Sequence, residues 1–108
     1  IAFETNDVFT VSEQAAAEGL ERLDISHNYY DDQEVRWGLD PALAERMADA
    51  DILYDRDGEA EYFQFYSRAF VRRVFFEIVE RRGYDGYGAV NAPIRLAAQA
   101  RHKPEFLD

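Results

Sequence analysis

The chain has 108 residues, no cysteine, and a formal net charge of −10 that comes from 12 Lys and Arg against 22 Asp and Glu. This size fits one domain with a modest core, and the 47% hydrophobic fraction is typical of a folded protein. Without cysteine there is no disulfide, no thiolate metal site and no cysteine nucleophile. The negative charge argues against nucleic acid as a partner, because it repels the phosphate backbone.

Nothing in the sequence predicts a membrane or secreted protein. No apolar run approaches the ~20 residues of a membrane-spanning helix, and no basic-then-apolar secretory segment opens the chain. We therefore expect a cytoplasmic protein with no membrane partner. The chain opens at Ile1 inside an apolar run and without Met, so we also expect a piece of a longer protein.

The first quarter of the chain predicts a strand, a helix and a second strand. Residues 1–5 form a short apolar run. Thr10 stands before Glu13 at the spacing of a capping box, and the helix that follows is expected to end at Gly19. Residues 23–25 alternate apolar and polar side chains, as a half-buried strand does.

The second quarter predicts helical structure. Residues 28–38 fit either an irregular segment or a short helix. Asp40 and Pro41 have the residue types of a helix N-cap and of the first helical position. The helix that follows would turn one apolar face to the core, made by Leu43, Met47 and Ala50.

The second half of the chain changes to the period of strands. Residues 52–57 and 62–66 are strand candidates, and the hairpin signal Asp57-Gly58 follows the first of them. Residues 74–80 are a third candidate, apolar on both faces. The second candidate is therefore expected to be the returning strand of a hairpin.

The chain closes with a predicted helix. After a glycine-rich loop at residues 83–88, Asn91 is a favourable N-cap. No repeat, linker or low-complexity segment divides residues 1–108, so we assign them to a single module. The order of elements predicts an α+β fold with helices on one side of a sheet. The apolar face of the last helix would be made by Pro93, Leu96, Ala97 and Ala100.

Glu77 is the carboxylate that a simple surface position explains least well. Period 2 puts it on one strand face with Phe75 and Val79, and the opposite face is also apolar. A carboxylate there is costly unless it is paired or binds a metal. Two interpretations stay open: a metal or acid–base role, or a structural position, either paired with Arg68 or Arg72 or more exposed than the pattern indicates.

Gln64 alternates with tyrosines on the neighbouring strand candidate, either on a wet outer face or as a polar group inside a pocket. A sheet with helices on one side would leave its aromatic face uncovered. We therefore expect that face to pack against a sister module or an identical chain. The shared period-2 phase predicts that one concave face is lined by Tyr62, Gln64, Tyr66, Phe75 and Glu77.

The two imidazoles, His27 and His102, lie far apart in the sequence and have no metal-ligand spacing. Surface positions are expected for both. A catalytic Fe(II) site of two imidazoles and one carboxylate is therefore not evident from this chain alone. No catalytic residue is assigned.

Six stretches, taken in order, resemble the C-terminal part of the 4-hydroxyphenylpyruvate dioxygenase family. Phe-Phe-Glu-Ile-Val-Glu-Arg at residues 75–81 is similar to the family's Phe-Phe-Glu-Ile-Ile-Gln-Arg. Phe-Gln-Phe-Tyr-Ser at residues 63–67 is similar to Leu-Gln-Ile-Phe-Thr. One piece alone would be weak, but six in the right order are a specific signal. The other four lie at residues 1–3, 28–32, 52–57 and 86–91.

The resemblance implies a βαβββ module of the vicinal oxygen chelate (glyoxalase/dioxygenase) fold, with a final helix that closes over the site. It implies that Glu77 is a ligand of Fe(II), for which Mn, Co or Zn could substitute. Gln64 corresponds to a pocket glutamine near a small keto-acid or aromatic-acid substrate. Tyr87 corresponds to an aromatic residue of the pocket lining, and we assign Asn91 to the same pocket.

This sequence also departs from the family. One of the family's iron-binding imidazoles would directly precede Ile1 and the other would lie in a sister module, so neither is present. Val90 and Ala92-Pro93 replace family residues near the closing helix. The ending, residues 86–99, resembles more closely a two-domain relative, in which a dioxygenase-like region is fused to a sugar-isomerase-like barrel with 3-dehydroshikimate dehydratase activity. Two functions follow: a metal-binding enzyme module, or an accessory domain for binding or assembly.

Overall fold

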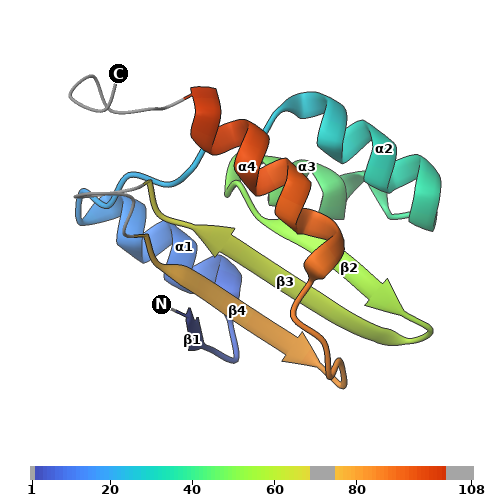
Figure 1. Ribbon diagram of the computed structural model, residues 1–108. Coiled ribbons are helices and arrows are strands. Elements are labelled where there is room, and N and C mark those ends of the chain that lie inside the picture. Colours follow the sequence, from blue (N-terminus) through green and yellow to red (C-terminus); the bar gives the residue numbers. More distant parts are fainter. Residues whose placement is uncertain (1, 69–74, 102–108) are drawn as a thin grey trace.

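The computed structural model describes residues 2–68 and 75–101 (Figure 1). None of the helices in these two ranges is long and apolar enough to cross a membrane. Helices and strands follow in the order expected for an α+β fold. The elements are β1 (Ala2–Glu4), α1 (Val8–Ala17), α2 (His27–Trp37), α3 (Pro41–Asp49), β2 (Leu53–Asp57), β3 (Ala60–Tyr66), β4 (Glu77–Arg82), the 3-10 helix η1 (Ala89–Asn91) and α4 (Ala92–Arg101).

The strands of the described residues form one mixed sheet in the order β1-β4-β3-β2. β1 runs parallel to β4, and the other neighbours are antiparallel. Along the β3–β4 ladder, Tyr66 lies opposite Glu77 and Gln64 lies opposite Val79. The predicted βαβββ order is confirmed, with α1, α2 and α3 all inserted between β1 and β2.

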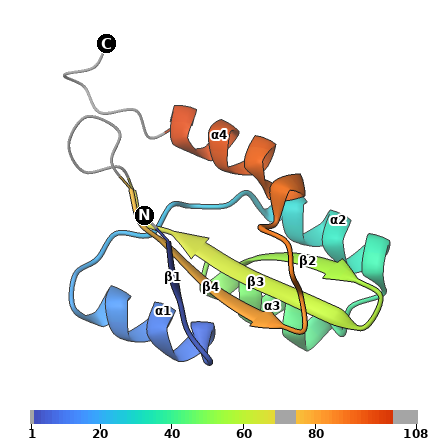
Figure 2. The ribbon, with the colours of Figure 1, turned by 60° about the horizontal axis from the view of Figure 1, so that its bottom comes forward.

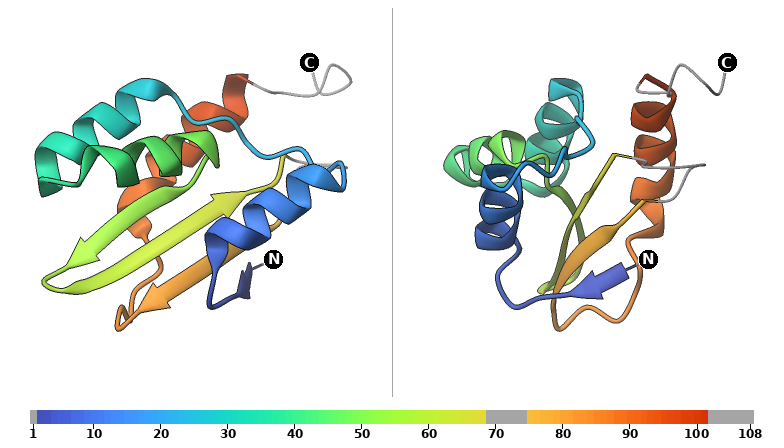
Figure 3. Two further views of the ribbon diagram at one scale, coloured as in Figure 1. Left: turned by 180° about the vertical axis from the view of Figure 1, so that it is seen from behind. Right: turned by 90° about the vertical axis from the view of Figure 1, so that its left-hand side faces the viewer.

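Helices cover both faces of the sheet. α1, α2 and α3 lie on one face, and α4 crosses the other (Figures 1 and 3). Figure 2 shows the same arrangement, with α4 above the sheet and α1 below it. The prediction of helices on one side only is therefore wrong. The glycine-rich loop makes the crossing possible, since Gly83 and Gly88 adopt φ values of 74° and 64°, which favour glycine.

The hydrophobic core lies between the sheet and helices α1–α3. Phe63 and Phe65 of β3 are each 1% exposed. The Phe63 ring meets the rings of Phe9 and Tyr54 at centroid distances of 5.8 and 5.1 Å. Each large apolar side chain buried in this way contributes about 1.5–3 kcal/mol. The predicted face of α3 joins this cluster through Leu43, Met47 and Ala50.

Two helices begin at side-chain caps, one of them as predicted. Asp40 accepts a hydrogen bond from the Ala42 amide at 3.0 Å, and Pro41 is the first residue of α3. The expected capping box at Thr10 is wrong, because α1 begins one turn earlier. Its N-cap is Asp7, which accepts bonds from the Thr10 amide at 3.2 Å and from the Thr10 hydroxyl at 2.6 Å.

Residues 23–25 form no strand, contrary to the prediction. Leu23 and Ile25 are buried and Asp24 is exposed. The alternation of apolar and polar residues therefore reflects which side chains face the core, and not a strand of the sheet. Next to this segment, Arg22 and Ser67 form an isolated bridge, flanked by bonds from the Leu23 amide to the Tyr66 carbonyl at 2.8 Å and from the Arg68 amide to the Glu21 carbonyl at 2.9 Å. The chain then enters α2, which resolves the open alternative for residues 28–38 in favour of a helix.

The bounds of the last strand and the buried face of the last helix differ from the prediction. β4 starts at Glu77, later than the predicted residues 74–80, and residue 74 lies outside the described residues. In α4 the predicted apolar face is wrong: Leu96 is 57% exposed, whereas Ala98 is buried and Ile94 is half-buried. The rotation of α4 follows Asn91, whose buried side chain is bonded to the interior instead of serving as a free N-cap.

Candidate functional site

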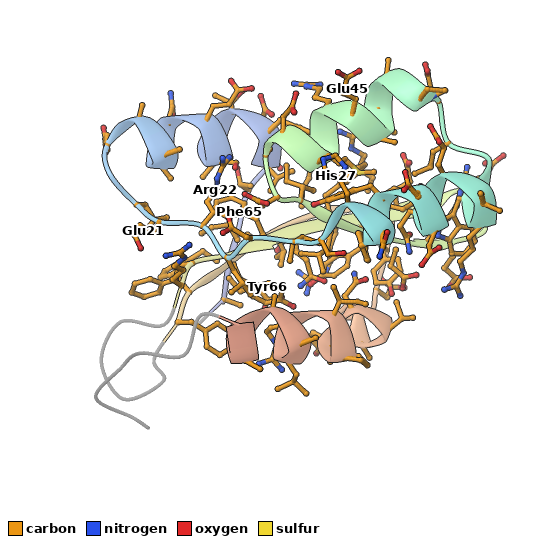
Figure 4. The ribbon with its side chains drawn as sticks, turned by 90° about the horizontal axis from the view of Figure 1, so that it is seen from above. Glu21, Arg22, His27, Glu45, Phe65 and Tyr66 are labelled. Atoms are coloured by element: carbon orange, nitrogen blue, oxygen red, sulfur yellow. The ribbon has the colours of Figure 1, made fainter. Side chains whose placement is uncertain are left out.

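A row of polar and aromatic side chains lies on the sheet face beneath α4. β3 contributes Tyr62, Gln64 and Tyr66, and β4 contributes Glu77. The pairing of Tyr66 with Glu77 puts all four on a common face, because side chains alternate with period 2. Figure 4 shows this alternation: Phe65 lies on the side of α1–α3 and Tyr66 on the side of α4. Gln64 is 0% exposed, and Glu77 is half-buried.

The Glu77 carboxylate receives its hydrogen bonds on one oxygen. The Gln64 side-chain amide donates from Nε2 to Oε1 at 2.5 Å, and the Tyr62 hydroxyl donates to the same oxygen at 3.2 Å. Gln64 Nε2 also donates to the Tyr66 hydroxyl at 2.9 Å. Hydrogen bonds to a charged carboxylate are stronger than neutral ones, so these donors hold the Glu77 side chain in place on the sheet face.

Asn91 joins the end of η1 to this row. Its Nδ2 donates to Gln64 Oε1 at 3.1 Å and to the Tyr54 carbonyl at 3.3 Å. Its Oδ1 accepts the Tyr29 hydroxyl at 2.9 Å. Asn91 is 1% exposed, and a buried amide with this set of bonds holds the start of α4 against the sheet.

The loop between β4 and η1 lies directly on the tyrosines. The Tyr84 ring stacks on the Tyr62 ring, with a centroid distance of 4.9 Å and an angle of 12° between planes. The Tyr84 hydroxyl forms a very short hydrogen bond with Asp55. Gly88 lies so close that a Cβ there would collide with the Tyr62 ring and Gln64 Oε1. A glycine is therefore required at this point of closest approach.

Two arginines flank the row. The Arg81 guanidinium lies 5.4 Å from the Tyr62 ring centroid, donates to the Gly86 carbonyl at 3.1 Å and pairs with Glu4 at 3.3 Å. The Arg95 guanidinium of α4 lies 5.8 Å from the Tyr66 ring centroid. Both cations are held over aromatic faces, a geometry that stabilises the site electrostatically.

The tyrosines of the site are held as neutral phenols. Burial, followed by the negative charge of Glu77, raises the pKa of Tyr66 to about 12, while the positive charge of Arg95 opposes the shift. Burial likewise raises the pKa of Tyr62, with Glu77 as the next cause. Near neutral pH both hydroxyls are therefore protonated donors, and neither is suited to act as a base.

The structure brings together five of the predicted site residues. Four form the row, Tyr62, Gln64, Tyr66 and Glu77, and Asn91 is the fifth, joined to the row by its hydrogen bond to Gln64. Phe75, just before β4, meets the Tyr66 ring at a centroid distance of 5.8 Å, so it borders the row. Tyr87 is 80% exposed and reaches the row only by its contact with Arg81, at 5.6 Å from the ring centroid. Arg68, the described arginine considered as a partner of Glu77, pairs instead with Glu21 and Asp24. The second one, at position 72, lies outside the described residues.

The described residues supply one carboxylate toward a metal and not a complete site. Within them, no group of three or more His, Cys, Asp or Glu side chains could hold a metal ion. His27 is exposed at the start of α2, on the side of the sheet opposite to α4 (Figure 4). The other imidazole, at position 102, lies outside the described residues. Glu77 therefore fits a metal site only with ligands from outside the described ranges.

Several contributors were missed by reasoning from the sequence. Arg81 shares the period-2 phase of Glu77, and this signal could have found it. Gly88 carried the signal of a glycine-rich loop and lies in one of the stretches that resemble the dioxygenase family, but neither indicated its close approach to Tyr62 and Gln64. Tyr29 and Arg95 gave no local signal, because they reach the row from helices on opposite faces of the sheet.

Comparison with known proteins agrees with this geometry. No family model matches the chain. A 3-dehydroshikimate dehydratase of Pseudomonas aeruginosa is 45% identical over 94% of this chain, and that of Pseudomonas putida is 43% identical over the same share. A 4-hydroxyphenylpyruvate dioxygenase of Pyricularia oryzae is 32% identical over 97% of the chain. The chain spans 16% of the length of the two dehydratases and 27% of the dioxygenase.

Two solved structures share the fold. A xylose isomerase-like TIM barrel/4-hydroxyphenylpyruvate dioxygenase fusion protein matches 95% of this chain and 17% of its own, with a TM-score of 0.91 and 41% identity. A mutant 4-hydroxymandelate synthase from Streptomyces coelicolor matches 95% of this chain and 29% of its own, with a TM-score of 0.81 and 24% identity. The second match supports the fold alone.

The fold and the comparisons define a dioxygenase-like α+β module. The chain is homologous to 3-dehydroshikimate dehydratases and to 4-hydroxyphenylpyruvate dioxygenases, as the resemblance predicted. In one solved relative the matching region is part of a fusion with a TIM barrel, so a further domain stands in the same chain there.

Proposed function

We propose that this chain is one module of a larger dioxygenase-like protein and supplies Glu77 as a ligand of a divalent metal. The observation that carries the proposal is the asymmetry of the carboxylate. Gln64 and Tyr62 both donate to Oε1, and among the described residues no hydrogen bond ends at Oε2. A half-buried carboxylate with one oxygen saturated and the other open is suited to bind a cation there.

The metal of this proposal is Fe(II), with Mn, Co or Zn as substitutes. The dioxygenase relative supports this choice by homology. Two imidazole ligands would come from outside the described residues, one directly before Ile1 and one from a sister module. When bound, Fe(II) would supply the binding and activation of oxygen together with a keto acid.

The residues of this chain would orient the ligand and exclude water. The protonated Tyr62 and Tyr66 hydroxyls and the Gln64 amide are donors on a buried face. Their aromatic surroundings under α4 favour a small keto acid or aromatic acid. The exposed Phe3 ring on the edge strand β1 supports packing against a sister module or a second copy. A cytoplasmic location is part of the same proposal.

The alternative is a dioxygenase-like accessory domain fused to a 3-dehydroshikimate dehydratase barrel, with a binding or assembly role. The identities of 45% and 43% to two dehydratases, against 32% to the dioxygenase, favour this domain arrangement. The sequence upstream of Ile1 separates the two: a TIM-barrel pattern supports the fusion, and another βαβββ pair without a barrel supports a plain dioxygenase.

The test of the metal role uses Glu77→Gln in the full-length protein. This change keeps the volume and removes the charge, so metal content measured by elemental analysis after iron-replete expression should fall strongly. Glu61→Gln is the matched control, because this half-buried glutamate lies on the neighbouring strand and accepts the Tyr54 hydroxyl instead. Equal metal content in the wild type and Glu77→Gln would reject the ligand role.

Oxygen consumption separates the enzyme from the accessory domain. If the module is an oxygenase, the iron-loaded full-length protein should consume oxygen in the presence of a keto acid, and Glu77→Gln should not. If the module is accessory, oxygen consumption is absent while the activity of the fused domain continues.

A further inference from the structure

Tyr29 of α2 is a buried tyrosine whose hydroxyl has three polar neighbours. It accepts the Tyr54 amide proton at 2.7 Å and lies 2.9 Å from Asn91 Oδ1 and 3.0 Å from the Tyr54 carbonyl. Tyr29 is 6% exposed, and burial raises its pKa, so the hydroxyl keeps its proton. A sequence pattern would class this residue as core, and it does not contact Glu77.

The direction of each hydrogen bond in this network can be assigned by counting donors. The Tyr29 hydroxyl has one proton to donate. The Asn91 Nδ2 group already donates to the Tyr54 carbonyl and to Gln64 Oε1, so Asn91 Oδ1 needs a donor, and Tyr29 is beside it. The Tyr54 backbone amide donates to Tyr29. The Tyr54 carbonyl is also within reach of the Tyr29 hydroxyl at 3.0 Å, but it already accepts from Asn91 Nδ2, so the Tyr29 proton goes to Asn91 Oδ1.

Counting donors and acceptors in the same way fixes the orientation of the Gln64 amide next to Glu77. With Asn91 Nδ2 directed at Gln64 Oε1, the Gln64 amide must point Nε2 at Glu77 Oε1, at 2.5 Å. The reverse orientation of Asn91 would put two oxygens together at Gln64. Turning Gln64 to avoid that contact would then put its Oε1 against the Glu77 carboxylate, which is repulsive.

We propose that Tyr29 is a positioning residue for Glu77, acting through Asn91 and Gln64 to keep an N–H donor on Oε1 and leave Oε2 for a ligand. The last step, ligand binding at Oε2, rests on the proposed function. The earlier steps do not depend on a metal. Partly satisfied buried networks are costly and ambiguous in orientation, so removal of the first donor should act on the last residue.

A double-mutant cycle tests the network without metal. Tyr29→Phe, Glu77→Gln and the double variant are made in the full-length protein, and hydrogen exchange is measured for peptides covering β3 and β4 in the presence of a chelator. Residues in one network couple, whereas separate sites contribute independently. Because each single variant already loses the shared coupling, the double variant should lose at least about threefold less protection than the product of the single effects.

Tyr30→Phe is the matched control. It makes the same chemical change at the next residue of α2, where the buried Tyr30 hydroxyl has no hydrogen-bond partner within the described residues. The Tyr30→Phe cycle with Glu77→Gln should be multiplicative. If Tyr29→Phe unfolds the module, Asn91→Ala takes its place in the same cycle. Multiplicative behaviour in the Tyr29 or Asn91 cycle would overturn the inference.

A Mn(II) titration tests the link to the ligand. The binding due to Glu77 is the difference between the wild type and Glu77→Gln. Tyr29→Phe should weaken this binding about tenfold, the lower end of the range for residues that support metal ligands, and Tyr30→Phe should leave it unchanged. Unchanged affinity in Tyr29→Phe counts against the inference. Absence of Glu77-dependent binding in the wild type overturns the proposed function instead, and the exchange cycle then decides the network alone.

Discussion

Two glutamates of β4, on opposite faces of the sheet, have very different surroundings. Glu80 lies on the core face and is 4% exposed; its Oε1 accepts the Val8 amide at 2.9 Å, and its Oε2 accepts from Arg82 at 2.6 Å. Glu77 lies on the face beneath α4 and receives bonds only on Oε1 from the described residues. Both oxygens of Glu80 are thus occupied by the fold, whereas one oxygen of Glu77 accepts no hydrogen bond from the part of the chain that the structure describes.

This difference separates a structural carboxylate from a candidate ligand. Glu80 sits at the N-terminus of α1, where an anion is stabilised by the helix dipole and by an otherwise unpaired amide. Arg82, which donates to Glu80, lies with its guanidinium 4.7 Å from the centroid of the Phe63 ring and covers this part of the core. Glu77 has two neutral donors and no ion pair within the described residues. If burial were the criterion, Glu80 would be assigned as the functional residue. The hydrogen-bond partners indicate Glu77 instead, because the partners of Glu80 occupy both of its oxygens.

The largest expected effect is on the core face. Phe63→Ala removes a ring that is 1% exposed and packs against Phe9 and Tyr54, so it should destabilise the module by about 4 kcal/mol. Tyr62→Phe, one residue earlier and on the other face, removes only a hydroxyl and should cost about 1 kcal/mol. Denaturant unfolding of the full-length protein, followed by hydrogen exchange in β3, measures both. Similar losses would mean that the two faces do not differ as described.

The next effect compares the two glutamates themselves. Glu80→Gln weakens the bonds to the Val8 amide and to a half-exposed arginine, so we expect a loss of about 2 kcal/mol. Glu77→Gln keeps an oxygen that can accept from Gln64, and its cost should be below about 1 kcal/mol. The same exchange measurement decides, with metal removed. A larger loss for Glu77→Gln would make Glu77 the structural residue of the pair.

The row on the α4 side was predictable because strand periodicity is local. Tyr62, Gln64, Tyr66 and Glu77 share one phase, and the register then brings Tyr66 opposite Glu77. The contacts that surround the row were not predictable, because they depend on how segments distant in the sequence pack against the sheet. The same pattern of apolar residues in α4 fits several rotations, and the buried amide of Asn91 selects one that exposes Leu96.

The carboxylates show the same limit. In the sequence Glu77 and Glu80 both follow apolar residues, and no local pattern indicates which of the two carboxylates has structural partners for both oxygens. Glu80 is satisfied by an amide 72 residues away, at the start of a helix whose first turn was also predicted one turn too late. The strands of the sheet, the presence of the closing helix and the row are therefore accessible from the sequence, although residues 23–25 were wrongly predicted as a strand. The buried face of the closing helix and the partners that assign roles depend on distant segments.

The smallest expected effect appears only at alkaline pH. Burial, followed by the charge of Glu77, raises the pKa of Tyr66 to about 12, above its unfolded value near 10. A raised pKa means that the folded state holds the proton more tightly. The contribution to stability is therefore complete below about pH 10 and is lost as the pH rises through about 12.

Glu77→Gln should lower the pKa of Tyr66, because it removes the charge that opposes phenolate formation, and Arg95→Gln should raise it. Spectrophotometric titration of phenolate absorbance, with Tyr66→Phe subtracted as the blank, measures each shift. A Tyr66 midpoint that responds to neither substitution would mean that its surroundings do not include these two charges. Opposite shifts in the two variants would locate Glu77 and Arg95 on the same face of the sheet, where α4 closes over the site.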